Sequence, residues 1–131
     1  MGVAYFIVLE KKIDALDTSM DGKLLARASE VLDDLATLHK VRPLTGFTSI
    51  DPADAAAFLE GEGMEVVQLP PVQQFSAEEG LTTVKALITH LELQPSALRN
   101  CEGVLDDLRN CQRILTAAAT HGIKWHFEVD V

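Results

Sequence analysis

The residues of this chain best suited to metal or acid–base chemistry are its four histidines. An imidazole side chain binds zinc and changes its charge near neutral pH. His121 and His126 flank a predicted turn, and His39 or His90 together with the Glu128 carboxylate would complete a set of zinc ligands. The sequence contains neither an HExxH nor a CxxC motif, however. We therefore expect no metal site and no cofactor, and we place His39, His90 and His121 on helix surfaces or helix ends.

The two cysteines, Cys101 and Cys111, would act as nucleophiles only as thiolates. Cys101 lies near a predicted helix start, which favours a thiolate, but Glu102, Asp106 and Asp107 surround it with negative charge. Cys111 falls on the apolar side of the same helix. At about 1.5 Å of rise per residue the two backbones are about 15 Å apart, which is too far for a disulfide. We expect two structural thiols in a reducing compartment, and hence a cytoplasmic protein.

The pentapeptide VLDDL occurs at residues 31–35 and again at residues 104–108. Two pairs of aspartates are suited to Mg²⁺ or Mn²⁺, because these ions prefer carboxylate oxygens. On a helix, however, the valine and leucines of this motif face the core, which turns both aspartates outward. We therefore expect solvated carboxylates. The residues that flank the two copies do not match, so the sequence does not indicate a duplicated domain.

The stretch RPLTGFTSIDP is the loop best equipped to bind a ligand. Thr45, Thr48 and Ser49 offer hydroxyl groups around Gly46 and beside the aromatic Phe47. The stretch contains neither a GxSxG elbow nor a phosphate-binding loop of the GxxxxGK[ST] kind. Connections of this length often only join two helices. We expect a connector, and keep Thr48 and Ser49 as candidate binding residues.

The chain closes on the segment HGIKWHFEVDV, in which apolar and polar residues alternate from Ile123 onward. A two-residue repeat is typical of a half-buried strand, whose successive side chains point to opposite faces. We predict that Trp125 faces the core. We also predict that His126 points the other way, among the charged side chains of Lys124 and Glu128. The adjacent tryptophan and histidine are therefore not expected to form one site.

Residue patterns along the rest of the chain predict an α+β fold: a small, mainly antiparallel sheet of about three strands, packed with about four helices. Strands are expected at about residues 3–9, 64–69 and 123–130, and helices at about residues 22–40, 52–61, 77–93 and 100–121. The length of 131 residues fits a single domain, residues 1–131.

Local end signals support several of these helices. Ser76 and Glu79 form a capping-box pattern, Asn100 is expected as a cap, and Gly122 is expected as a left-handed helix terminator. The first predicted helix carries apolar residues at three- and four-residue spacing: Leu24, Ala28, Val31, Leu32, Leu35 and Leu38.

The two terminal strands are the strongest in the chain, and we expect them to be neighbours, with the first strand central because both of its faces are apolar. Phe6 and Val8 would then share one side of the sheet with the charged face of the last strand. Either helices cover that side in part, or a second copy of the chain covers it. The second alternative predicts a homodimer.

The charge and apolar content of the sequence limit the partners that we expect. Twenty Asp and Glu residues against 11 Lys and Arg give a net charge of −9, which repels nucleic acid and anionic membranes and tolerates a basic protein partner. The longest apolar run, residues 3–9, is much shorter than the roughly 20 residues of a membrane span. The start of the chain also lacks a signal-peptide pattern.

Together these features favour a non-catalytic binding or interaction module of the cytosol, which uses an acidic surface that includes Glu128 and Asp130. The alternative is a small enzyme or ligand-binding domain with its pocket near the charged face of the last strand. The candidate binding residues of this alternative are Lys124, His126, Glu128, Thr48 and Ser49. The sequence assigns no catalytic residue.

Overall fold

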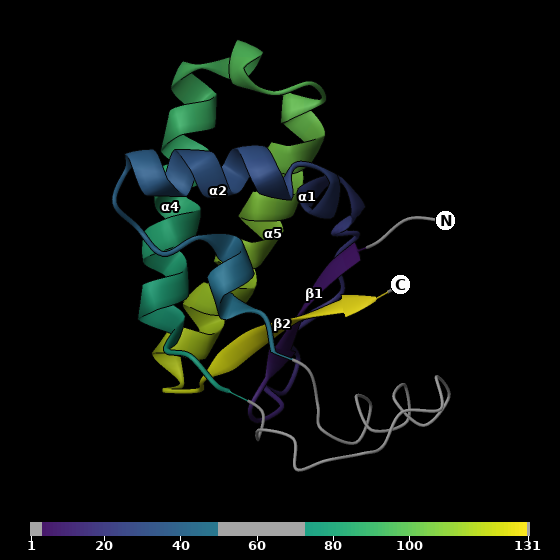
Figure 1. The fold of residues 1–131 in the computed structure, drawn as a ribbon. Coiled ribbons are helices and arrows are strands. Elements are labelled where there is room, and N and C mark those ends of the chain that lie inside the picture. Colours follow the sequence, from purple (N-terminus) through teal and green to yellow (C-terminus); the bar gives the residue numbers. More distant parts are fainter. Residues whose placement is uncertain (1–3, 50–72, 131) are drawn as a thin grey trace, which may run out of the picture.

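The computed structural model describes residues 4–49 and 73–130 and confirms a mixed helix-and-sheet fold in these two ranges (Figure 1). In chain order the elements are β1 (Ala4–Leu9), α1 (Lys23–Arg27), α2 (Ser29–Leu38), the 3-10 helix η1 (Leu44–Phe47), α4 (Ala77–Leu93), the 3-10 helix η2 (Pro95–Ala97), α5 (Cys101–Thr120) and β2 (Trp125–Asp130). The predicted helix 52–61 and the predicted strand 64–69 lie outside the described residues. The described sheet therefore has two strands, and the predicted third strand is not confirmed.

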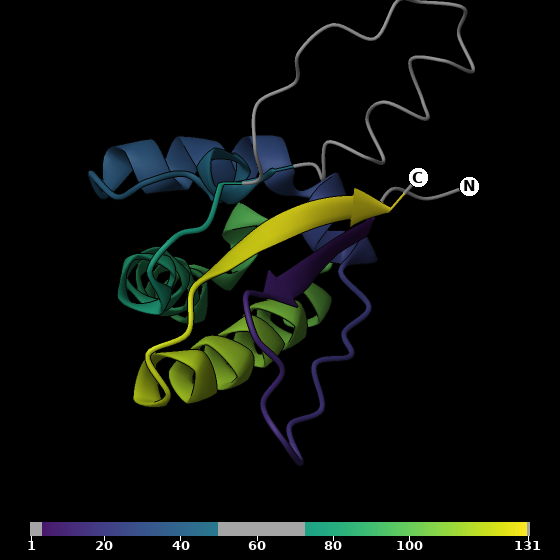
Figure 2. The same cartoon turned by 90° about the horizontal axis from the view of Figure 1, so that it is seen from below.

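Helices α4 and α5 run side by side, and α2 crosses them (Figures 1 and 2). The predicted start of α4 is confirmed, because the Ser76 hydroxyl accepts a hydrogen bond from the Glu79 backbone N–H at 3.1 Å. The predicted end of α5 is confirmed as well, because Gly122 adopts a left-handed φ of 65°. Asn100 does precede α5, but its side chain makes no capping hydrogen bond. In the described part of the chain no helix has both the length and the apolar character needed to cross a membrane.

The prediction of one continuous helix over residues 22–40 is wrong. The helix breaks at Ala28, whose φ and ψ of −92° and 3° separate α1 from α2. The two pieces pack against different partners, because α1 contacts β1 and α5 whereas α2 contacts α4 and η1. The buried face of α2 also differs from the predicted apolar face, because Val31 is 40% exposed and Leu38 is 66% exposed.

The two terminal strands are neighbours, as predicted, and pair antiparallel from Ala4 opposite Asp130 to Leu9 opposite Trp125. In the described part of the sheet, however, β2 and not β1 has partners on both edges. Its second edge forms isolated bridges with Thr48 and with Phe75. The expectation of a central first strand is therefore not met in these residues.

Trp125 is the centre of the core and, as predicted, is completely buried. Its ring stacks on Phe47 at 5.0 Å between centroids and meets the edge of Phe127 at 4.8 Å. The indole N–H donates to the backbone oxygen of Ser76 at 3.0 Å, which satisfies the one polar group of the side chain. Gly80, in the first turns of α4, lies against the indole so closely that a Cβ atom there would overlap the ring.

This packing predicts that Gly80→Ala destabilises the protein even though alanine favours a helix. Overpacking costs about 1–3 kcal/mol, whereas the helical gain of alanine over glycine is about 0.5–1 kcal/mol. We expect the free energy of unfolding, measured in urea, to fall by about 1–2 kcal/mol on balance.

Gly103→Ala in α5 is the matched control. A Cβ at Gly103 would meet only the terminal methyl group of Leu24, which is flexible enough to move. This variant should be at least as stable as the parent protein. Equal stability of the two alanine variants would contradict the close Gly80–Trp125 contact.

Candidate functional site

The outer face of the sheet, opposite the helices, carries the histidine and carboxylate that the sequence singled out. Phe6 lies opposite Glu128 and Val8 opposite His126, so the apolar side chains of β1 do share this face with polar side chains of β2. Phe6 and Val8 are half-buried. Residues of β1 and of the 12–18 segment line a cavity of about 340 Å³. These chain segments cover the face in part, and the homodimer stays a prediction.

His126 does point away from Trp125, as predicted, and it is buried there rather than open to water. Its side chain is only 2% exposed. Nδ1 lies 3.1 Å from the side-chain oxygen of Gln74, and Nε2 lies 2.8 Å from a carboxylate oxygen of Glu128. Gln74 reaches this position because its neighbour Phe75 pairs with Trp125 on the second edge of β2, opposite β1. A buried imidazole requires such partners, since an unpaired polar group away from water is costly.

The His126 geometry suits a structural role better than catalysis. A general base needs a ring nitrogen whose lone pair faces the substrate. The contact with the Glu128 carboxylate, which only accepts hydrogen bonds, requires a proton on Nε2. The Gln74 amide can present either its oxygen or its NH₂ group to Nδ1. In both orientations the two ring nitrogens are engaged.

Thr48 and Ser49 lie along the second edge of β2, the edge that does not pair with β1. The Thr48 hydroxyl donates to the backbone oxygen of Thr45 at 2.7 Å, which closes the η1 turn. The Ser49 backbone N–H donates to the oxygen of Phe127 at 2.9 Å, and its hydroxyl accepts from the N–H of Gln73 at 3.0 Å. Both hydroxyl groups therefore hydrogen-bond the backbone, that of Thr48 within its own turn and that of Ser49 to the segment before α4.

Lys124 completes the set of predicted binding residues. It is exposed and lies just before β2, where its backbone oxygen accepts from the N–H of Glu10 at 2.9 Å. Of the five predicted residues, the structure brings His126 and Glu128 into direct contact and places Ser49 along the same strand. The partner Gln74 was missed, because only the pairing of Phe75 with β2 positions it.

The two VLDDL copies do not present matching pairs of outward carboxylates, so that expectation is wrong. Asp107 is 5% exposed and accepts a hydrogen bond from the N–H of Leu25 at 3.2 Å. Burial raises the pKa of Asp107, although hydrogen bonds from the backbones of Leu25 and Gly22 oppose the shift. In the first copy, Asp33 accepts from the Thr45 hydroxyl at 2.7 Å. Each copy thus contributes one aspartate that ties its helix to another part of the chain.

Both cysteines are free and buried on α5, which agrees with packed structural side chains. Burial raises the pKa of the Cys111 thiol strongly, so this group remains protonated at neutral pH.

His121 is exposed and caps the end of α5. His39 and His90 were predicted as ordinary residues of helix surfaces or helix ends. In the structure Nε2 of His39 lies 2.9 Å from Nδ1 of His90. Residues 4–49 and 73–130 contain no cluster of three or more potential metal ligands.

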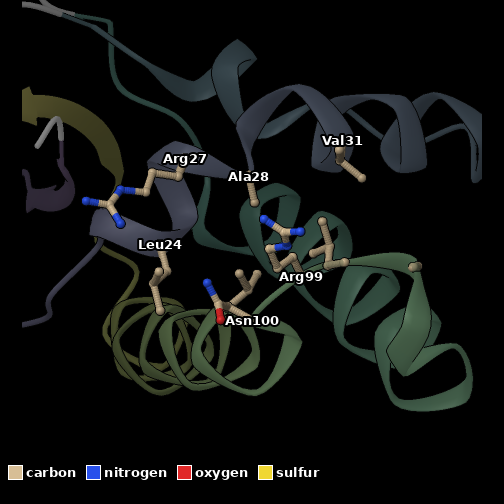
Figure 3. Close-up of a pocket in the computed structure, with 9 residues that line it drawn as sticks. Leu24, Arg27, Ala28, Val31, Arg99 and Asn100 are labelled. Atoms are coloured by element: carbon tan, nitrogen blue, oxygen red, sulfur yellow. The ribbon is translucent and has the colours of Figure 1, made fainter.

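A pocket of about 370 Å³ lies where the α1–α2 junction faces η2 and the start of α5 (Figure 3). We call it the Arg99 pocket; it is lined by Leu24, Arg27, Ala28, Val31, Ala97, Leu98, Arg99, Asn100 and Val104. The guanidinium group of Arg99 lies beneath Ala28, whereas Arg27 extends away from Arg99 (Figure 3). The pocket therefore combines apolar walls with two exposed arginines, of which only Arg99 turns toward Ala28.

Arg99 and the other arginine of the pocket, Arg27, differ from Arg42 and Arg109 in that neither has a carboxylate partner among the described residues. Arg42 pairs with Glu79 at 3.6 Å, and Arg109 pairs with Glu92 at 3.5 Å. Across the described ranges Arg99 forms no such ion pair. The pocket also lies at the amino end of the 20-residue helix α5, where backbone N–H groups carry partial positive charge.

Comparisons with protein-family models, with curated proteins and with solved structures found no match.

If His126 is structural, His126→Leu should lower the free energy of unfolding by about 1–3 kcal/mol, because Gln74 and Glu128 lose a buried partner. Chemical denaturation measures this change. His121→Leu is the matched control at an exposed helix end, and should cost less than about 1 kcal/mol. Equal effects of the two substitutions would contradict a structural role for the His126 contacts.

The raised pKa of Asp107 predicts a pH dependence of stability. Between the unfolded value, about 3.9, and the raised folded value, the folded state binds more protons than the unfolded state. The stability of the parent protein should therefore fall relative to Asp107→Asn as the pH rises through this window. Urea unfolding of both proteins from pH 3.5 upward measures the difference, with Asp106→Asn as the control for loss of one charge from α5. Parallel curves for the parent and Asp107→Asn would refute the prediction.

Proposed function

We propose that this chain is a non-catalytic binding module whose ligand site is the Arg99 pocket. Its ligand class is a small organic anion with an apolar tail. The observation that carries the proposal is an arginine without a carboxylate partner among the described residues, set beside an apolar cavity in a chain of net charge −9.

The size and the apolar walls of the pocket favour a ligand with an apolar tail. A volume of about 370 Å³ falls in the usual range for small-molecule sites, which are mostly apolar with a few placed polar groups. Val31 stands at its margin with 40% of its surface exposed. Covering such surface contributes about 25 cal/mol per Å². A short aliphatic tail would thus gain its binding energy by filling the cavity.

Arg99 and the adjacent amino end of α5 favour an anionic group on the ligand. A guanidinium group donates two parallel hydrogen bonds to a carboxylate or phosphate. The side chain of Asn100 does not cap the helix, so it leaves the first N–H groups of α5 without that partner. Glu102, in the first turn of α5, opposes an anion at this site, whereas exposed charges beyond about 10 Å are screened at 0.1 M salt.

The contacts of the predicted binding residues favour this pocket over the sites expected from sequence. Glu128 was expected to contribute to an acidic docking face, but its side chain is 19% exposed and hydrogen-bonded to His126. The alternative enzyme site also required a histidine that is available to substrate, and both ring nitrogens of His126 are engaged. These contacts support binding at the Arg99 pocket rather than catalysis at the outer sheet face.

Octanoate, which has one carboxylate and an aliphatic tail, is the test ligand, and octanol and octylamine are its matched controls. By isothermal titration calorimetry, octanoate should bind more tightly than either control. Arg99→Gln should weaken octanoate binding roughly tenfold or more, since a charge-assisted hydrogen bond contributes about 1.5–3 kcal/mol.

Arg27→Gln is the control variant, because Arg27 lines the same pocket but extends away from Arg99. It should change the octanoate affinity much less than Arg99→Gln. The proposal is wrong if octanoate fails to bind, if octylamine binds equally well, or if the two glutamine variants behave alike.

A further inference from the structure

His39 and His90 form a second polar cluster, which shares no residue with the Arg99 pocket. His39 caps the end of α2 and His90 lies in the last turn of α4. Nε2 of His39 is 2.9 Å from Nδ1 of His90, and the ring centroids are 5.1 Å apart with the planes at 77°. Residues far apart in the sequence thus present two ring nitrogens to each other.

The short contact between the rings requires one N–H group and one lone pair, since two N–H groups would repel. If the donor ring instead carries its proton on its other nitrogen, both facing nitrogens offer lone pairs, and a divalent transition metal that prefers imidazole can bind between them. Two nitrogens at about 2.0–2.1 Å from a tetrahedral metal are about 3.3 Å apart, so the rings need to separate by only a few tenths of an ångström. His39 is exposed and His90 half-buried, and both side chains can turn to direct their lone pairs at one ion.

The surroundings of the pair favour a cation. The carboxyl end of a helix carries partial negative charge, and the ends of α2 and α4 meet at these two rings. The chain as a whole adds a net charge of −9. The two helix ends and the net charge therefore favour a divalent ion at the two imidazoles, whereas the exposed Lys40 next to His39 opposes it.

We propose that His39 and His90 form a two-nitrogen site for a divalent transition metal, with the remaining coordination positions open to water. The described residues place no third histidine, cysteine or carboxylate in the cluster, so binding is reversible and modest rather than structural. Among first-row divalent ions, Cu²⁺ binds nitrogen sites most tightly, which makes it the best probe.

The test is titration of the purified chain with Cu²⁺, followed by electron paramagnetic resonance and calorimetry. One Cu²⁺ per chain should bind with a hyperfine pattern from two nitrogens. His39→Gln and His90→Gln should each weaken binding roughly tenfold or more, because either change removes the intramolecular second ligand. Both substitutions alter surface or half-buried side chains, and circular dichroism verifies that the variants are folded.

His121→Gln is the matched control, since His121 is exposed at a helix end but has no histidine partner in the described structure. It should bind Cu²⁺ as the parent protein does. The proposal is overturned if His39→Gln or His90→Gln retains the parent affinity. A spectrum with a single nitrogen ligand, or failure of the parent chain to bind Cu²⁺, would overturn it as well.

Discussion

Packing of the Trp125 ring against the first turns of α4 ties the last strand to the rest of the molecule. The indole reaches its position because residue 80 has no side chain, and its N–H is satisfied by the backbone of Ser76. The backbone of Trp125 pairs with Leu9 on one edge and with Phe75 on the other. A single residue thus connects the sheet, the helical layer and the segment that precedes α4.

The chemistry of the outer sheet face follows from this constraint. With Trp125 turned inward, strand alternation forces His126 outward, and pairing of Phe75 brings Gln74 beside it. The imidazole then binds Gln74 and Glu128 instead of water. A histidine and a carboxylate in contact look like catalytic machinery, but here their hydrogen-bonding capacity is used to keep a polar strand face buried.

The two proposed binding sites lie at opposite ends of α2. The break at Ala28 leaves space between the helix junction and the start of α5, which becomes the Arg99 pocket. The far end of α2 meets the end of α4 and brings His39 to His90. Both sites therefore depend on the path of one short helix across the α4–α5 pair.

Several features of this protein are determined locally, and the sequence predicted them. The extents of α4 and α5 follow from apolar spacing and from signals such as Ser76 and Gly122, which act within a few residues. The inward orientation of Trp125 follows from strict two-residue alternation.

Tertiary contacts decided the remaining features. No glycine or proline marks the break at Ala28, and the two helices that it separates pack against different elements. Asp107 was expected in water, but it binds the start of α1, 82 residues earlier in the chain. His126 and His39 likewise take their partners from other elements. The periodicity of a segment specifies which of its faces is apolar, whereas the partner of a polar side chain depends on which distant segment packs against it.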